Sequence, residues 1–348
     1  MGTYRLILAY MVIFDHTHDP FFGSYAIGVS AVISFFLLSG FVMTALIEKY
    51  YFSISSLPAF FIERFLRLAP QFYFYSFLTL IGMHFFGLRH DFMQFEPSTK
   101  SIIFQFGLVP LDFYRHFPSM LLPQAWSLGL EATFYAAFPF LLLNGLRFPA
   151  AILSMCVYLA AYSGFIDTDL WGYRYLPGTL FIFICGSFLY SAERRKEHLL
   201  VLAVFMGAIG LLALTYVVPN TTPLFNLYNR SVLSGLILGI PIVWSLKPLS
   251  HESGKGSAID SMAGNLSYGV YLSHMLIIGI METYFHIKYE NLDFWQGIQM
   301  TTSVIFLATC LGYLSFKFLE SPMVELRRRG RQRQLTINKR VSGAAEVK

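Results

Sequence analysis

The sequence predicts an all-α integral membrane protein of about ten transmembrane helices, with both termini in the cytoplasm. Of its 348 residues, 55% are hydrophobic and 13% are charged. A soluble domain carries roughly 25% charged residues, so this chain has too little polar surface to be solvated by water alone. The aromatic residues Phe, Trp and Tyr, which are part of the hydrophobic set, make up 18% of the chain, and Tyr and Trp favour the membrane–water interface. The composition therefore excludes an ordinary soluble fold.

Ten apolar segments follow one another along the chain. Most approach the ~20 residues that an α-helix needs to cross the hydrocarbon core of a bilayer. They cover residues 5–22, 28–47, 70–88, 125–145, 149–166, 176–192, 199–218, 230–246, 262–285 and 295–317. We predict one transmembrane helix in each segment.

The basic residues between these segments predict the orientation. A cytoplasmic N-terminus would place the richer set of loop cations inside: Lys49, Arg64, Arg67, Arg147, Arg194, Arg195, Lys196, Lys247, Lys255 and the tail. Loops on the cytoplasmic side carry an excess of Lys and Arg. Both termini are therefore expected inside, which requires an even number of spans.

The chain divides into a transmembrane domain, residues 1–325, and a basic cytoplasmic tail, residues 326–348, for which we expect disorder. The net charge of +5 comes largely from this tail and from short loops, so it indicates membrane topology and no nucleic-acid partner. The longest outer loop, 89–124, is rich in aromatic residues and is expected to form a lid. Cys156, Cys185 and Cys310 lack the paired spacing of a metal site.

A basic residue, Arg5, and a titratable residue, His16, lie on one face of the predicted first span. Arg5 and His16 are eleven residues apart, which returns to nearly the same helix face about 16 Å further along the axis. This arrangement suits a molecule that lies along the helix, with an anionic part at Arg5 and a reactive part at His16. Imidazole can act as a base near neutral pH. The alternative for Arg5 is an anchor at the cytoplasmic surface.

Two carboxylates are candidates to assist His16. Glu131 lies in the outer half of the fourth span, at a depth similar to that of His16, and Asp15 is the sequence neighbour of His16. A carboxylate beside an imidazole selects its tautomer and stabilises its cation. The alternative for Glu131 is a structural partner for a buried cation.

Basic and small residues near the cytoplasmic side suggest a site for an anion. Arg64 and Arg67 are three residues apart in the inner loop 48–69, so on a helix they share a face. Guanidinium groups suit phosphate, although a lipid headgroup is the alternative ligand. Ser39 and Gly40 allow close approach by a ligand or by a neighbouring helix.

Four further residues are candidates to line a polar cavity on the acceptor side. Trp126 and Ser127 begin the fourth span, and Tyr271 and His274 share a face of the ninth. His274 has an alternative role as the partner of a nearby hydroxyl.

Six segments together resemble the membrane-bound acyltransferase-3 family from Arg5 to about Glu320. They are Arg5 with His16; Phe35-Phe36-Leu37-Leu38-Ser39-Gly40-Phe41; Arg64-Phe65-Leu66-Arg67 before Pro70; Trp126-Ser127-Leu128-Gly129-Leu130-Glu131 with Phe134-Tyr135 and Pro139; Ser267-Tyr268 with Tyr271-Leu272 and His274; and Glu320-Ser321-Pro322. Ser34 departs from the family pattern, in which an acidic residue often precedes the Phe pair. Each motif is short, but their order and topological places agree with the family.

The resemblance implies an O-acetyltransferase in the inner membrane of a bacterium. Such an enzyme moves an acyl group, usually acetyl, from cytoplasmic acyl-CoA to a hydroxyl of an extracytoplasmic carbohydrate, such as O-antigen, exopolysaccharide or a lipid-linked saccharide. Acetyl-CoA is then a substrate, and no permanently bound cofactor is expected.

The resemblance and the residue placement together assign roles. Arg5, Arg64 and Arg67, with Ser39 and Gly40, would bind acyl-CoA. His16 would be the general base or, in a covalent variant, the acyl carrier, with Glu131 or Asp15 to orient it. A secondary transporter that uses buried His, Glu and Arg is the competing function, but the chain shows no internal repeat of the kind many transporters have.

Overall fold

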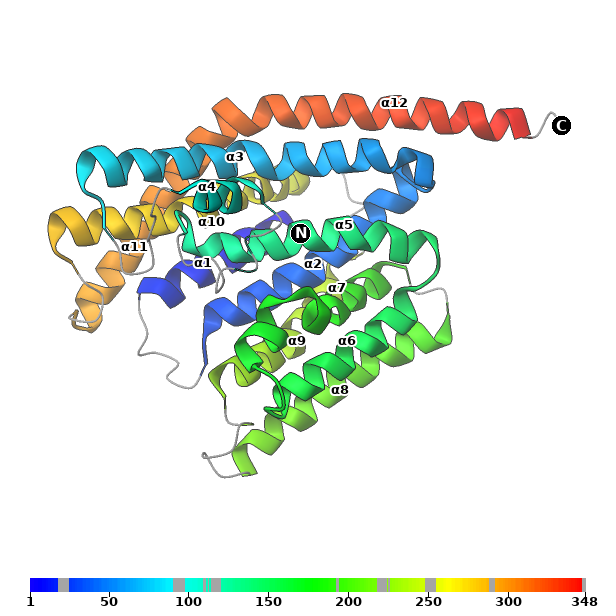
Figure 1. Cartoon of the computed structure of the whole chain (residues 1–348), viewed down its shortest axis with the longest axis horizontal. Helices are drawn as coiled ribbons and strands as arrows, with labels where there is room; N and C mark the ends of the chain where they lie inside the picture. Colours follow the sequence, from blue (N-terminus) through cyan, green and yellow to red (C-terminus); the bar gives the residue numbers. More distant parts are fainter. Residues whose placement is uncertain are drawn as a thin grey trace.

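The computed structural model describes residues 1–17, 25–89, 98–108, 111, 113, 120–191, 194–217, 224, 226–247, 255–287 and 292–345. All regular secondary structure in these ranges is helical. Figure 1 shows most of the long helices running side by side along one direction. The predicted all-α class is confirmed.

Each of the ten predicted apolar segments contains a helix. These helices are α1 (Gly2–Thr17), α2 (Ile27–Tyr50), α3 (Leu57–Phe86), α5 (Trp126–Leu143), α6 (Arg147–Tyr162), α7 (Leu176–Tyr190), α8 (Arg195–Val217), α9 (Leu227–Ser245), α10 (Lys255–Phe285) and α11 (Phe294–Ser315). The predicted end of the first span, residues 18–22, lies outside the described residues. Shorter elements are α4 (Thr99–Phe106), the 3-10 turns Ile54–Ser56 and Pro123–Ala125, and the π-helical turns Leu170–Arg174 and Phe316–Glu320.

Five helical segments are long and apolar enough to cross a membrane. They are Ile27–Tyr50, Pro123–Leu143, Arg195–Val217, Leu227–Ser245 and the apolar part of Phe294–Lys339. α8 turns large apolar side chains outward, including Leu199, Leu202 and Met206. Exposed apolar surface of this extent is typical of a helix that faces lipid. The number of ten spans and the cytoplasmic location of the termini stay predictions.

The helix α2 lies at the centre of the bundle, packed against α1, α7 and α9. It is apolar on all sides, and such a helix is stable only where neighbours or lipid surround it. Two glycines permit its close crossing with α7. A Cβ on Gly40 would lie 1.7 Å from the carbonyl oxygen of Phe183, and one on Gly186 would lie 1.9 Å from that of Leu37.

Two segments outside the predicted spans are helical. The inner loop 48–69, in which Arg64 and Arg67 were placed on one face of a helix, contains the first half of α3, which continues through Pro70 to Phe86. The tail, expected to be disordered from residue 326, is the helix α12, which runs from Ser321 to Ala345. The physical reason is tertiary: side chains of α12 bind Glu63 and Glu320, so the helix has partners that its polar composition does not reveal.

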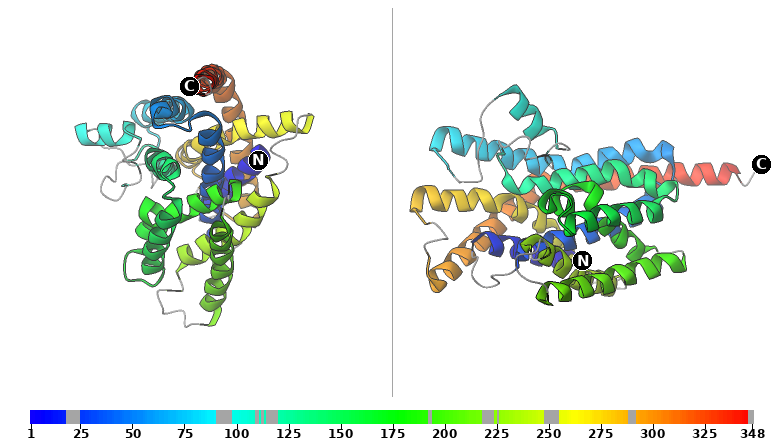
Figure 2. Two further views of the ribbon diagram at one scale, coloured as in Figure 1. Left: turned by 90° about the vertical axis from the view of Figure 1, so that its right-hand side faces the viewer. Right: turned by 60° about the horizontal axis from the view of Figure 1, so that its bottom comes forward.

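α12 lies beside α3 and extends past the end of the bundle, as both Figure 1 and Figure 2 show. Its start follows the π-helical turn that ends α11. The chain therefore returns its last helix to the N-terminal half of α3, the segment that carries Arg64 and Arg67.

The predicted lid, 89–124, falls partly outside the described residues. In its described part, Gln105 is buried, donates to Ser76 of α3 and accepts from the amide of Leu121. Gln124 donates to the carbonyl oxygen of Leu272 in α10 at 2.8 Å. The segment thus packs on α3 and α10, and its function as a lid stays a prediction.

Replacing Gly40 with Ala should destabilise the α2–α7 crossing, because the new methyl group would overlap the backbone of Phe183. Overpacking of this kind costs about 1–3 kcal/mol. The thermal unfolding midpoint in detergent measures the effect. Gly207→Ala is the matched control, since a Cβ at Gly207 in α8 has no neighbour within 4 Å. Equal midpoints for the two variants would contradict the close crossing.

Candidate functional site

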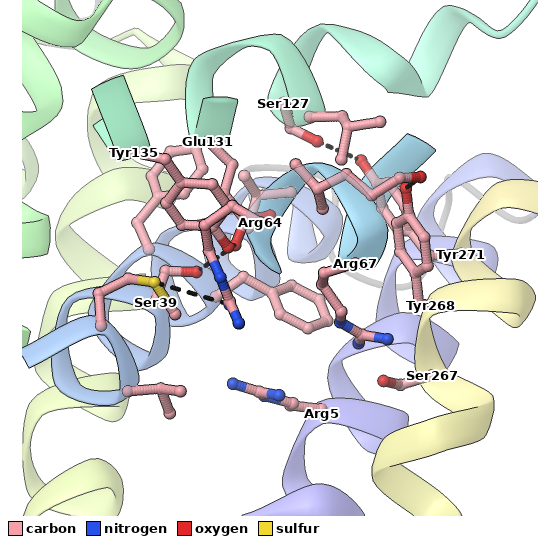
Figure 3. A pocket seen from close by; sticks show the side chains of 17 residues that line it. Arg5, Ser39, Arg64, Arg67, Ser127, Glu131, Tyr135, Ser267, Tyr268 and Tyr271 are labelled. Carbon is pink, nitrogen blue, oxygen red and sulfur yellow. Dashed lines mark hydrogen bonds between the residues drawn. The ribbon is translucent and has the colours of Figure 1, made fainter. Parts of the chain in front are cut away.

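A pocket with a volume of about 120 Å³ lies between α1, α2, α3, α5 and α10. One part of its wall is apolar, formed by Val32, Phe35, Phe36 and their neighbours. The labelled residues in Figure 3 supply the polar part: Arg5, Ser39, Arg64, Arg67, Ser127, Glu131, Tyr135, Ser267, Tyr268 and Tyr271. A space of this size holds several water molecules or a slender ligand.

Three arginines converge on the pocket from two helices. Arg5 comes from α1, whereas Arg64 and Arg67 come from successive turns of α3 and share a face as predicted. Arg64 donates to Glu63 Oε1 at 2.7 Å and lies over the ring of Tyr135. Arg67 pairs with Glu320 and lies over the ring of Tyr268.

Glu131 accepts hydrogen bonds from two pocket residues. Ser39 Oγ donates to Glu131 Oε1 at 2.7 Å, and the hydroxyl of Tyr135, one turn further along α5, donates to the same oxygen. Both of these partners of Glu131 lie in the pocket wall. The role of Glu131 in orienting His16 stays a prediction.

The pocket wall carries more positive than negative charge. Among the residues that line it, three carry guanidinium groups, Arg5, Arg64 and Arg67, and Glu131 carries a carboxyl group. Glu63 and Glu320 bind Arg64 and Arg67 from outside the pocket wall. Burying unbalanced charge is costly, and a bound anion removes the cost. Arg64 also has a buried Nε without a hydrogen-bond partner among the described residues. The pocket is therefore suited to an anionic ligand such as a phosphate ester.

A histidine pair lies beside the pocket. His16 Nδ1 and His274 Nε2 are 3.0 Å apart, and the planes of the two rings are nearly parallel, with an interplanar angle of 8°. His274 Nδ1 lies 2.6 Å from the carbonyl oxygen of Tyr271. The structure thus brings together two predicted residues from α1 and α10, and His274 is a direct neighbour of His16.

Tyr271 connects the pocket to the histidine pair. Its ring lines the pocket, its hydroxyl bonds to Ser127 Oγ at 2.8 Å, and its carbonyl oxygen contacts His274. Since Arg5 lies in the pocket wall and His16 lies eleven residues along α1, the pocket and the pair occupy successive levels of the same helix. The roles of Arg5 in binding an anion and of His16 as a base stay predictions.

Besides His16 and His274, three predicted site residues lie outside the pocket wall. Gly40 faces the backbone of Phe183 in α7, so its role is close packing. Trp126 stacks edge-on with Tyr173 and lies under Arg174, with its ring centroid 4.5 Å from the guanidinium carbon. Asp15 lies against Gly28 of α2, where an added Cβ would be 2.7 Å from Asp15 Oδ2.

Four residues of the site received no role from sequence reasoning. Glu63 and Glu320 hold the pocket arginines, and Tyr135 and Tyr268 cover them. The signal was present for each: Glu63 precedes Arg64 directly, and the other three lie in the quoted motif segments. Which carboxylate faces which arginine depends on helix packing, and the sequence does not show it.

The fold and the pocket define a helical membrane protein with a buried, arginine-lined cavity. The chain belongs to the acyltransferase-3 family, whose sequence profile, described as an acyltransferase domain, matches residues 3–317. The protein is therefore an acyltransferase. The resemblance drawn from the six motifs is confirmed.

Two relatives illustrate this similarity. An uncharacterized protein of Aquifex aeolicus is 28% identical over 215 residues, covering 60% of this chain and 91% of that protein. The peptidoglycan O-acetyltransferase OatA of Listeria monocytogenes is 26% identical over 355 residues, covering 91% of this chain. The chain spans about half of OatA, 53% of its length. No solved structure matches the chain significantly.

Glu320→Ala should destabilise the protein strongly, because it leaves Arg67 as an uncompensated charge in a buried position. The side chains of Arg67 and Glu320 are 17% and 3% exposed, and breaking such a pair costs about 3–5 kcal/mol. Thermal unfolding in detergent measures the loss. Glu325→Ala, which breaks the exposed pair with Arg329, should change stability by less than about 1 kcal/mol. A loss at Glu320 as small as this would show that Arg67 does not depend on the pair.

Proposed function

We propose that the protein transfers an acetyl group from cytoplasmic acetyl-CoA to a hydroxyl of an extracytoplasmic carbohydrate. The observation that carries the proposal is the convergence of Arg5, Arg64 and Arg67 on one pocket, with the His16–His274 pair further along α1. This order suits a long donor whose phosphates and reactive thioester are far apart. Family membership supports the class of reaction.

The arginines would bind the phosphates of acyl-CoA at the cytoplasmic end of the bundle. Guanidinium forks match phosphate oxygens, and the three groups reach the pocket from α1 and α3. The pantetheine arm would then extend past Ser39 and the apolar wall toward Tyr271. His16 lies about 16 Å from Arg5 along the helix axis, a separation that an extended arm can bridge.

The contacts of His274 select a tautomer for His16. The carbonyl oxygen of Tyr271 only accepts, so His274 Nδ1 carries a proton, and in the neutral ring Nε2 is then an acceptor. His16 Nδ1 therefore donates to His274 Nε2, and the lone pair of His16 lies on Nε2. This is the tautomer that a general base requires.

In the proposed reaction, His16 Nε2 takes the proton of the acceptor hydroxyl. The alcohol oxygen attacks the thioester carbonyl carbon, the C–S bond breaks, and the proton passes to the departing CoA thiolate. The covalent variant uses the same atoms in two steps: His16 first accepts the acetyl group and then passes it to the hydroxyl. His274 stabilises charge on His16 in both routes, whereas Glu131 holds Ser39 and Tyr135 in the pocket wall.

The name of one relative supports a carbohydrate acceptor. OatA of Listeria monocytogenes is named for peptidoglycan, and surface glycans carry the hydroxyls that such a transferase would modify. Ser127, Tyr271 and the neighbouring Trp126 lie at the end of the pocket nearest the histidine pair, where an acceptor would approach. The setting we propose is a bacterial inner membrane with the α12 end in the cytoplasm.

His16→Ala should abolish acetyl transfer while the folded protein persists. A positioned general base is worth about 10²–10⁴ in rate, and the covalent route would be lost completely. Release of CoA thiol in the presence of glycan fragments, together with size-exclusion behaviour, measures both properties. His84→Ala is the control, since His84 is exposed near the end of α3. Turnover equal to that of the wild type would refute both routes.

Arg64→Ala combined with Arg67→Ala should weaken binding of acetyl-CoA by about 100-fold or more, because two charge-assisted phosphate contacts are lost. Calorimetric titration of detergent-purified protein measures the dissociation constant. Arg195→Ala, on the exposed start of α8, is the control. If folded wild type binds neither acetyl-CoA nor longer acyl-CoAs, the donor assignment fails and the transporter function gains support.

A further inference from the structure

Two arginines of α12 share carboxylates with the pocket arginines. Arg331 binds Glu63 Oε1 through Nε at 2.9 Å and a terminal nitrogen at 2.5 Å. Arg64 donates to the same oxygen at 2.7 Å. One carboxylate oxygen thus joins a guanidinium of the C-terminal helix to a guanidinium of the pocket.

The same arrangement recurs about one helical turn away. Arg327 contacts Glu320 Oε1 at 3.3 Å, and Arg67 pairs with that same oxygen. Gln71 donates to the other oxygen, Glu320 Oε2, at 2.6 Å. Each of the two motif arginines of α3 is therefore linked through a carboxylate to one arginine of α12.

These contacts are buried deeply enough to matter energetically. The side chains of Glu63 and Glu320 are each 3% exposed, and that of Arg327 is 9% exposed. Charge pairs in such surroundings are much less screened than pairs on the surface. Together with Arg5 and Glu131, the cluster contains five guanidinium groups and three carboxylates, so it keeps a surplus of two positive charges when the carboxyls are ionised.

We propose that Arg327 and Arg331 are positioning residues for the donor pocket. Each of them binds a carboxylate that also binds a pocket arginine: Arg327 shares Glu320 with Arg67, and Arg331 shares Glu63 with Arg64. Through these shared carboxylates, Arg67 and Arg64 keep N–H donors directed at the pocket. The proposal rests on the proposed function, in which the pocket arginines bind the donor phosphates. α12 is then part of the donor site, although neither of its arginines lines the pocket.

The physical reason lies in the competition for each carboxylate. Glu63 divides its attraction between Arg64 and Arg331. Without Arg331, Glu63 would pair with Arg64 alone and draw its guanidinium toward the carboxylate and away from a phosphate. The cluster would also lose one positive charge, which lowers its attraction for an anion. The same reasoning applies to Arg327, Glu320 and Arg67.

The test is calorimetric titration of acetyl-CoA into the full-length protein carrying Arg327→Gln and Arg331→Gln. The dissociation constant should rise by about 10- to 100-fold, as for other residues that orient a binding group. The binding stoichiometry should stay at the wild-type value, because the fraction of competent protein does not change. Arg327→Lys with Arg331→Lys retains the charges and should recover most of the affinity.

Arg329→Gln is the matched control on the same helix. Arg329 pairs with Glu325 at the surface, and its side chain is 71% exposed. Its substitution should leave the dissociation constant within about twofold of the wild type, since exposed pairs contribute little.

Three outcomes distinguish a failure of the proposed function from a failure of the positioning role of Arg327 and Arg331. Wild-type protein that does not bind acetyl-CoA would refute the proposed function itself. If Arg64→Ala with Arg67→Ala weakens binding while the α12 double variant binds like the wild type, only the positioning role is refuted. A lowered stoichiometry with an unchanged dissociation constant would also refute it, because α12 would then support folding alone.

Discussion

The pairing of buried guanidinium groups with buried carboxylates is the constraint on which the rest of the site depends. Arg64 and Arg67 can remain inside an apolar bundle because Glu63 and Glu320 lie beside them. Removing a charge from water costs several kcal/mol, and a close partner offsets that cost. Around the pocket the bundle keeps a surplus of positive charge, which a bound anion can balance.

Helix packing places this charge cluster at a useful position. Gly40 and Gly186 let α2 and α7 approach closely. Ser39, which precedes Gly40, lies on the side of α2 that faces the pocket. α1 packs against both α2 and α10, so that Arg5 reaches the pocket while His16 meets His274. The apolar faces that bury α2 thus also determine which polar side chains meet. Stability and the proposed chemistry share the same contacts.

Much of the fold could be predicted, because it depends on local composition. Each predicted apolar segment contains a helix, and the spacing of Arg64 and Arg67 places them on one pocket-facing side of α3. The site was predicted less completely. Glu131 bonds Tyr135, one turn away on α5, and Ser39 of α2, and the tail expected to be disordered is α12. Ser39 and the carboxylates that bind α12 are remote in sequence from their partners, so no local pattern indicates these contacts.

The sequence alone determined the helices, the family and the residue types that the chemistry needs. Hydrophobic length and periodicity act within about 20 residues, and the motifs are equally local. The tertiary structure decided which of these residues meet. His16 and His274 are 258 residues apart in the chain, Arg67 and Glu320 are 253 apart, and Glu63 and Arg331 are 268 apart. Such pairs form only when helices pack, because the energy of a buried contact depends on the surroundings that packing creates.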